Sequence, residues 1–264
     1  HPALDPVTFP SGVTQTLGDA SNMCMTCHQG RSSGDDITAA VDNGVVQAPT
    51  DYTSYDFINR HYFAAAAILF GTDVTAGYEY AAKTYVGENT FASHPASLNS
   101  CLECHMRGAA QDHTWEPQLG DCSGCHTGMT SFEDLGLPFG AANVDYDGNG
   151  VGESFQKEID GMAALLYTEI QAYADGSLGG VAHSSKIVYG PGSYPYWFVD
   201  TNGDGIAQED ETVYANRYRD FDFDLLAAAY NYHSAQDPCN DMHNYQYCIQ
   251  TLYDSIEALG GDVT

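Results

Sequence analysis

The stretch Cys101-Leu102-Glu103-Cys104-His105 decides how this chain folds. The same Cys-x-x-Cys-His pattern recurs at residues 24–28 and 122–126. Residues i and i+3 share one face of a helix, so both thiols of a motif can reach the two vinyl groups of one haem. The following histidine then lies beneath the ring, where it binds the iron. Three complete copies of the pattern predict three covalently attached haem c groups.

The predicted attachment residues fall into two chemical sets. The thioether bonds are assigned to Cys24, Cys27, Cys101, Cys104, Cys122 and Cys125, and the proximal iron ligands are His28, His105 and His126. A pair of structural zinc sites is the competing interpretation of the Cys-x-x-Cys spacing. It would need two such pairs close together, whereas the first pair lies far from the second along this chain.

The remaining cysteines indicate an oxidising compartment. Eight cysteines less the six haem thiols leave Cys239 and Cys248. An even remainder in an exported protein predicts a disulfide between them, worth about 2–3 kcal/mol for a short loop in the chain-entropy model. The chain opens His1-Pro2-Ala3-Leu4 without a visible signal peptide, which predicts a processed form.

The composition limits the possible partners. The 264 residues fit one large domain or two small ones, and 36 acidic against 8 basic residues give a formal net charge of −28. Nucleic acid and anionic membrane surfaces are poor partners for such a surface. The longest apolar run, residues 62–71, is about half of what a membrane span needs, so no membrane span is expected.

Hydrophobic periodicity predicts a mainly α-helical chain with extensive coil, built around the haems. We expect an irregular arm over residues 1–23, helices over 56–70, 154–174, 220–232 and 244–259, and short strands over 186–189 and 196–199. Haem motifs stop before residue 140. The chain therefore divides into a haem-attachment region, 1–140, and a helical region with calcium-type loops, 141–264, that returns a distal histidine; together they are expected to form one compact unit.

The sixth position of each iron decides what the haems can do. A second histidine suits electron transfer, whereas a vacant position allows chemistry on a small molecule. The predicted distal ligands are His61, His113 and His243, with His94 as a competitor for one of the three places. His61 lies on the apolar face of the predicted 56–70 helix, His113 lies between two haem motifs, and a Cys239–Cys248 bridge would orient His243.

Residues 200–211 match the twelve-residue calcium loop. Its predicted ligands are Asp200, Asn202, Asp204, the carbonyl of Ile206, and Glu211. A second loop begins at residue 145, and its predicted ligands are Asp145, Asp147, Asn149, the carbonyl of Val151, and Glu153. This loop has Gln156 where the final carboxylate belongs, so either Glu153 or Glu158 would close it. One or two structural Ca²⁺ ions follow from these loops, and the competing interpretation is a pair of solvated acidic turns.

Taken together, these residues resemble the multihaem c-type cytochromes of metal-reducing and related bacteria. The matching pieces are the three haem motifs, His61-Tyr62, His105-Met106 followed by His113-Thr114-Trp115, the 145–153 stretch, the 194–198 stretch leading into the 200–211 loop, and His243-Asn244. The resemblance implies bis-histidine haems, close haem stacking and export. Some extracellular relatives polymerise into filaments that carry a continuous chain of haems. The predicted disulfide is not part of the resemblance.

The favoured function is electron transfer by a trihaem cytochrome, extracellular or at the cell surface, that assembles into a conducting filament. Its partners would be redox proteins, extracellular electron acceptors and further copies of the chain. A monomeric periplasmic or extracellular electron shuttle is the alternative. A multihaem reductase with one open haem is less favoured, because candidate distal histidines are plentiful and basic residues for anion binding are scarce. A calcium-braced adhesive protein is the remaining alternative.

Overall fold

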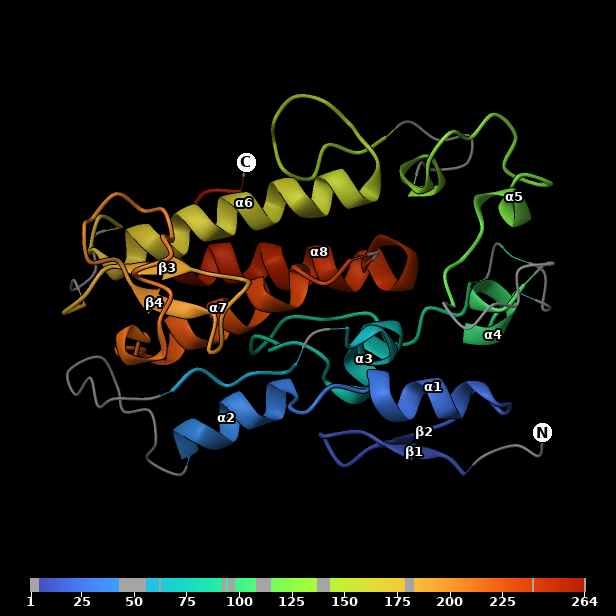
Figure 1. Ribbon diagram of the computed structural model, residues 1–264, viewed down its shortest axis with the longest axis horizontal. Coiled ribbons are helices and arrows are strands. Elements are labelled where there is room, and N and C mark those ends of the chain that lie inside the picture. Colours follow the sequence, from blue (N-terminus) through green and yellow to red (C-terminus); the bar gives the residue numbers. More distant parts are fainter. Residues whose placement is uncertain are drawn as a thin grey trace.

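Helices dominate the computed structural model of the chain (Figure 1). It describes residues 5–42, 56–61, 63–91, 94, 98–107, 115–136, 143–178, 183–238 and 240–263. The helices are α1 Ser21–His28, α2 Gly34–Asp42, α3 Ala65–Phe70, α4 Cys101–His105, α5 Leu119–Cys122, α6 Phe155–Ala174, α7 Phe223–Ala235 and α8 Asn240–Leu259. Short 3₁₀ turns cover Gly71–Val74, Phe132–Gly136 and Tyr214–Asn216, and the strands are β1 Val7–Thr8, β2 Thr14–Gln15, β3 Ile187–Tyr189 and β4 Trp197–Val199.

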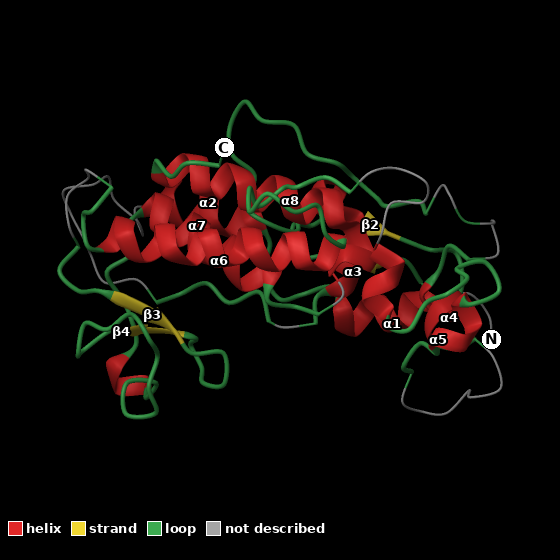
Figure 2. Cartoon of the chain, turned by 90° about the horizontal axis from the view of Figure 1, so that it is seen from above, coloured by secondary structure: helices red, strands yellow, loops and turns green. Residues whose placement is uncertain are grey.

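The core is a bundle of α6, α7 and α8 (Figure 2). Every residue of α7 from Leu225 to Ala235 is buried, because other elements cover this helix on all sides. The Asp222 carboxylate accepts a hydrogen bond from the Leu225 amide at 2.9 Å and so caps its first turn. The predicted helices over 154–174 and 220–232 are confirmed as α6 and α7.

The haem motifs and the β3–β4 hairpin lie at opposite ends of the molecule. In both views α1, α4 and α5 lie toward one end, and the β3–β4 hairpin lies at the other (Figures 1 and 2). The hairpin pairs Ile187 with Val199 and Tyr189 with Trp197, as the predicted strands over 186–189 and 196–199 require. α3, from the haem-attachment region, packs against α8.

Two predictions for the first part of the chain were wrong. The arm over residues 1–23 is not wholly irregular, because β1 and β2 pair as a small antiparallel hairpin and α1 begins at Ser21. The helix predicted over 56–70 is confined to α3, which begins at Ala65. His61 and Phe63 have positive φ angles of 70° and 58°, which a right-handed helix excludes. His61 therefore lies outside any helix.

Polar side chains explain why the helix starts late. Asn59 Oδ1 accepts a hydrogen bond from the His61 amide at 2.8 Å, which is a local turn that competes with helix formation. The Asp237 carboxylate accepts hydrogen bonds from the Phe63 and Ala64 amides at 2.8 and 3.0 Å. Asp237 follows α7, so the beginning of α3 is capped by a residue far away in the sequence.

α8 contains a break at the position where the sequence predicted its start. Asn244 has non-helical angles, φ −169° and ψ 77°. Its Oδ1 accepts a hydrogen bond from the Tyr247 amide at 3.3 Å, and its Nδ2 donates to the Gly87 carbonyl at 3.0 Å. Asn244 thus acts as an N-cap inside the merged helix. His243 is fixed at the end of the short first segment, directly before this cap.

Candidate haem sites

Each haem motif lies on a helical turn, as its spacing requires. The first motif ends α1 and the second forms α4. The third begins at the end of α5, and the His126 amide donates to the Cys122 carbonyl at 2.9 Å, which continues the helical turn through the motif. In every motif the second cysteine is exposed and the first is partly exposed, and all six thiols are free. The residues therefore fit covalent attachment of a haem on the outer side of each turn.

The three motifs follow one another in space. The Leu102 amide donates to Ser21 Oγ at 3.4 Å, so the second motif packs on the helix that carries the first. Burial, together with the neighbouring Cys24 thiol, raises the pKa of the Cys101 thiol to about 11. Burial also raises the pKa of the Cys104 thiol, and Cys122 of the third motif adds to that shift. The long segment between the first two motifs thus returns to bring them together.

Two backbone carbonyls orient the proximal histidines. Nδ1 of His28 donates to the Phe63 carbonyl at 2.7 Å, and Nδ1 of His105 donates to the Trp115 carbonyl at 2.8 Å. With Nδ1 protonated in this way, Nε2 of each neutral ring keeps a lone pair for an iron. Phe63 and Trp115 also share a left-handed backbone, with φ angles of 58° and 56°.

The sequence interpretation missed these two carbonyls. A signal for them existed, because Phe63 follows His61 by two residues and Trp115 follows His113 by two residues. In both places an aromatic residue ends a His-x-aromatic stretch. The shared spacing indicates one local device that is used at two motifs.

Two pairs of imidazole rings face each other at a spacing that suits an iron. The His105 and His243 ring centroids are 6.4 Å apart, and the ring planes differ by 3°. The His94 and His126 centroids are 6.1 Å apart, with planes that differ by 31°. A metal–imidazole bond of about 2 Å on each side, extended by the radius of each ring, gives a separation of about 6 Å. The centroid separation of each pair is therefore the one that two imidazoles on a single iron require.

The structure describes only some of the other predicted site residues. His61 is partly buried, and His113 lies outside the described residues. Cys239 also lies outside them, while Cys248 is a free thiol that is 3% exposed. The disulfide between these two cysteines stays a prediction. In the described residues, the cap at Asn244 directly follows His243.

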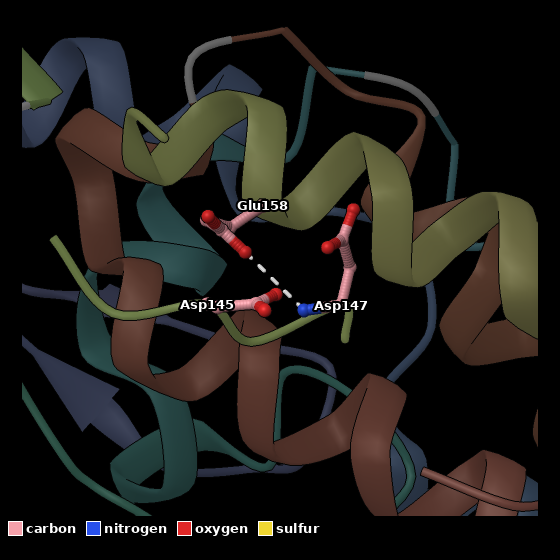
Figure 3. Close-up of side chains that lie close together, drawn as sticks. All are labelled: Asp145, Asp147 and Glu158. Atoms are coloured by element: carbon pink, nitrogen blue, oxygen red, sulfur yellow. Dashed lines mark hydrogen bonds between the residues drawn. The ribbon is translucent and has the colours of Figure 1, made fainter. Parts of the chain in front are cut away.

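The 145–153 loop gathers three carboxylates. Oxygen atoms of Asp145, Asp147 and Glu158 lie within 4.8 Å of one another (Figure 3). Glu158 is 1% exposed, and one of its oxygens accepts from the Tyr146 amide at 2.7 Å. Burial raises the pKa of Asp147, and the charge of Glu158 adds to this shift. Three carboxylates so close together fit a hard cation that would offset their repulsion.

Glu158, rather than Glu153, completes this group. Glu153 accepts a hydrogen bond from Asn149 Nδ2 at 3.2 Å, and its other oxygen lies 3.6 Å from Lys157 Nζ. Of the two alternatives that the sequence left open, the structure favours Glu158, which enters from the first turn of α6. A Cβ at Gly161, one turn along α6, would meet Asp147 Oδ2 at 1.8 Å, so glycine makes room for the loop there.

The 200–211 loop has the same internal hydrogen bonds. The Gly205 amide donates to Asp200 Oδ2 at 2.9 Å, as the Gly150 amide donates to Asp145 Oδ2 at 2.8 Å. Glu211 accepts from the Thr201 amide at 2.8 Å, which matches the bond of Glu158 to the Tyr146 amide. Within the described residues, however, only the 145–158 group brings three carboxylates within reach of one ion.

Comparison with known proteins agrees with the motif geometry. The chain is 29% identical to the C-type polyheme cytochrome OmcC of Geobacter sulfurreducens over 92% of its own length. It is 28% identical to the C-type polyheme cytochrome OmcB of the same species over 97% of its length. These relatives, at 28–29% identity over most of the chain, support the multihaem c-type cytochrome family. The family expected from the motifs is thereby confirmed.

The cytochrome covers 31% of OmcC and 34% of OmcB, so it spans about a third of the curated relatives it matches. No family model matches the chain, and no solved structure is similar to it. Across the described part of the cytochrome, no helix is long and apolar enough to cross a membrane.

Proposed function

We propose that this cytochrome transfers electrons through three haem c groups, each bound by two histidines. The observation that carries the proposal is the spacing of the two imidazole pairs, 6.4 Å for His105–His243 and 6.1 Å for His94–His126. When bound, the haems supply one-electron redox chemistry at the iron, and two imidazoles leave no open position for a substrate. This arrangement suits a carrier better than a reductase.

The pairs suggest which histidine serves which motif. We assign His243 to the haem of the 101–105 motif and His94 to the haem of the 122–126 motif. His94 was the competitor among the sequence candidates, and its ring faces a proximal histidine. These assignments leave the haem of the 24–28 motif, for which His61 and His113 are the remaining predicted ligands.

Chain length favours His113 for that haem. The Phe63 carbonyl binds Nδ1 of His28, on the side of His28 that faces away from its iron. His61 is only two residues from Phe63, and two residues span at most about 7 Å. That reach is too short to pass around the macrocycle to its opposite face. His61 can therefore bind only an iron other than that of the 24–28 motif.

An extracellular, filament-forming role is the favoured setting. Cys27, Cys104 and Cys125 are exposed, so a haem attached there would bring an edge close to the surface. An edge at the surface is what haem-to-haem contact between copies requires. The net charge of −28 favours the alternative, a separate electron shuttle, unless cations screen it.

We further propose that Ca²⁺ braces the two acidic loops. The convergence of Asp145, Asp147 and Glu158 supports the first ion, and the loop sequence with its matching hydrogen bonds supports the second. Both loops contact α6, since Gln171 Nε2 donates to the Gly205 carbonyl at 2.8 Å and Glu158 belongs to α6. The ions would thus hold the loops against the core and reduce the acidic charge.

The haem proposal is tested by intact mass and by low-temperature electron paramagnetic resonance of the ferric protein. Three covalent haem additions and only low-spin ferric signals are expected. A high-spin signal in the native protein would show a vacant iron and favour the reductase. Fewer than three additions would contradict the trihaem assignment.

A further inference from the structure

A buried tyrosine and a buried histidine form a hydrogen-bonded pair away from the haem motifs. Tyr189, in β3, is 8% exposed, and His233, in α7, is 4% exposed. Tyr189 Oη lies 2.7 Å from His233 Nδ1. In the described part of the chain, His233 Nε2 is buried without a hydrogen-bond partner.

The proton of this hydrogen bond belongs to the tyrosine. If His233 Nδ1 were the donor, the Tyr189 hydroxyl hydrogen and the Nε2 lone pair would both lack a hydrogen-bond partner among the described residues. If Tyr189 donates, only the Nε2 hydrogen is left, so the second arrangement costs less. Burial and the nearby Arg60 charge lower the pKa of His233 to about 3. The ring is therefore neutral at neutral pH and can accept the phenolic proton.

Aromatic rings pack around His233. The Tyr196 ring centroid lies 4.5 Å from that of His233, and the Phe57 centroid lies 5.5 Å away. The His233 ring is thus part of a buried aromatic cluster. A neutral imidazole nitrogen that accepts a hydrogen bond from a buried phenol is placed to take up the phenolic proton when the tyrosine is oxidised.

The same rings make a continuous path to the surface. Tyr189 stacks on Tyr196 at 6.4 Å, and Tyr196 contacts Tyr194 at 6.2 Å. Tyr194 is 58% exposed and stacks on Tyr214, which is 55% exposed. On the inner side, the Trp197 ring lies 4.9 Å from Tyr189. Every step of this path therefore joins neighbouring aromatic rings.

We propose that Tyr189 and His233 form a proton-coupled redox site that traps oxidising equivalents inside the protein and passes them to Tyr194 at the surface. The oxidant is a strong one-electron acceptor, such as hydroxyl radical formed from hydrogen peroxide, which becomes hydroxide. Tyr189 loses one electron to it and its phenolic proton to His233 Nδ1, leaving a neutral tyrosyl radical and an imidazolium.

The radical then moves outward by electron transfer between the tyrosines. An electron passes from Tyr194 through Tyr196 to the Tyr189 radical, and the proton on His233 returns to Tyr189 Oη. Tyr194 releases its own proton to water and becomes the radical. A small-molecule one-electron reductant in solution restores it.

Trp197 shows by contrast why Tyr189 is the trap. Trp197 is fully buried, and within the described residues its indole nitrogen has no hydrogen-bond partner. An oxidised indole there has no group in the described part of the chain to take its N–H proton, whereas oxidised Tyr189 can pass its phenolic proton to His233. Tyr189 has an acceptor at 2.7 Å and takes the oxidising equivalent from the adjacent Trp197.

The test oxidises the fully ferric holoprotein with photogenerated ruthenium(III) tris-bipyridine, using persulfate as electron acceptor, and traps radicals for electron paramagnetic resonance. We expect a tyrosyl radical whose high-field g-tensor shows a strong hydrogen bond. Tyr189→Phe should abolish that signal, and His233→Phe should abolish it or shift its g-tensor to that of a radical without a hydrogen bond. In the native protein, formation of the radical should slow in D₂O.

The matched control is Tyr218→Phe, which removes the hydroxyl of a fully buried tyrosine that donates to the Ser185 carbonyl at 3.2 Å. A carbonyl cannot take up a proton as imidazole can, so this variant should keep the native signal. A signal that survives in a folded Tyr189→Phe protein would overturn the proposal. If the variants fail to fold, a native radical without a strong hydrogen bond would overturn it equally.

Discussion

A backbone carbonyl can define what a histidine is able to bind. The Phe63 and Trp115 carbonyls hold Nδ1 of His28 and His105, and this leaves Nε2 of both rings for iron. The side chains of Phe63 and Trp115 take no part in these two hydrogen bonds. What matters is a left-handed backbone at both residues, which turns the carbonyl toward the histidine.

The first residue-scale prediction concerns His243. Because its ring faces His105 across 6.4 Å, His243→Ala should leave the haem of the 101–105 motif with one protein ligand. We expect one of three haems to become high-spin while the other two stay low-spin. The ferric resonance spectrum, with spin quantified against the native protein, checks this result.

His183→Gln is the control for that experiment, since His183 Nδ1 is already bonded to the Asp220 carbonyl and lies in no imidazole pair. It should leave all three haems low-spin. A fully low-spin spectrum in His243→Ala would remove His243 from the ligand set and return its place to the other histidines.

The second residue-scale prediction separates two neighbouring glutamates. Glu158→Gln should weaken Ca²⁺ binding about tenfold, or by about 1.4 kcal/mol, because it removes one of three converging charges. Glu153→Gln should change binding far less, since Glu153 bonds Asn149 instead. Calorimetric titration of chelator-treated protein measures both. Equal effects of the two substitutions would contradict the assignment of Glu158.

At the scale of elements, periodicity predicted well wherever a helix packs along its whole length. α6 and α7 begin and end close to the predicted bounds, because their apolar positions face one continuous core. The helix over 56–70 failed because Asn59 forms a local turn and Asp237, 173 and 174 residues away from Ala64 and Phe63, supplies the cap. A contact that distant leaves no periodic trace in the sequence.

The candidate site likewise has residues that local spacing predicts and residues whose positions depend on tertiary packing. Attachment residues follow from local spacing, so all three motifs could be named from the sequence. The facing of His94 and His126 depends on how separate segments pack, and spacing could offer only competing candidates for the distal places. Glu158 was left open for a similar reason, because its place in the cluster depends on how α6 approaches the 145–153 loop.

The element-scale prediction concerns the cap of α7. Burial lowers the pKa of His183, but hydrogen bonds to the Asp222 carboxylate and the Asp220 carbonyl outweigh burial and raise it overall. Burial likewise raises the pKa of Asp222, and hydrogen bonds from His183, Leu225 and Tyr173 outweigh it and lower the pKa. The charged pair thus forms across the N-terminus of α7.

The signs of these two shifts define a pH window. A raised histidine pKa contributes stability below its ordinary value of about 6.5 and loses it as the pH rises through the folded-state pKa. The lowered pKa of Asp222 contributes stability above about 3.9 and loses it as the pH falls through the folded-state pKa. The pair therefore stabilises the fold most between about pH 3.9 and about pH 6.5.

Thermal unfolding of native protein should consequently show a Tm that falls as the pH rises above about 6.5. Each loss of about 1 kcal/mol should lower Tm by about 2–4 °C in a chain of this size. His183→Gln should flatten this part of the profile and also weaken the acid side, because His183 supplies one of the hydrogen bonds that lower the pKa of Asp222. An unchanged alkaline slope in the variant would show that another group produces it.

At the scale of the whole molecule, charge and haem placement act against each other. A net charge of −28 opposes contact between copies, whereas exposed attachment residues bring haem edges toward the surface, where contact would be useful. Screening decides between them, because the Debye length shortens from about 30 Å at 0.01 M salt to about 8 Å at 0.15 M. Bound Ca²⁺ at the two loops would act in the same direction.

The last prediction follows from this balance. Sedimentation velocity at constant protein concentration should show separate molecules at low salt with chelator, and long assemblies as NaCl and Ca²⁺ are restored. Electron cryo-microscopy of the assembled fraction should then show helical filaments with haem edges in contact between subunits. The double variant Glu158→Gln and Glu211→Gln should shift assembly to higher salt, because it weakens both loops while leaving the haem motifs untouched. Separate molecules under every condition, with three low-spin haems, would mean that electrons leave through a soluble partner and that this cytochrome is a shuttle.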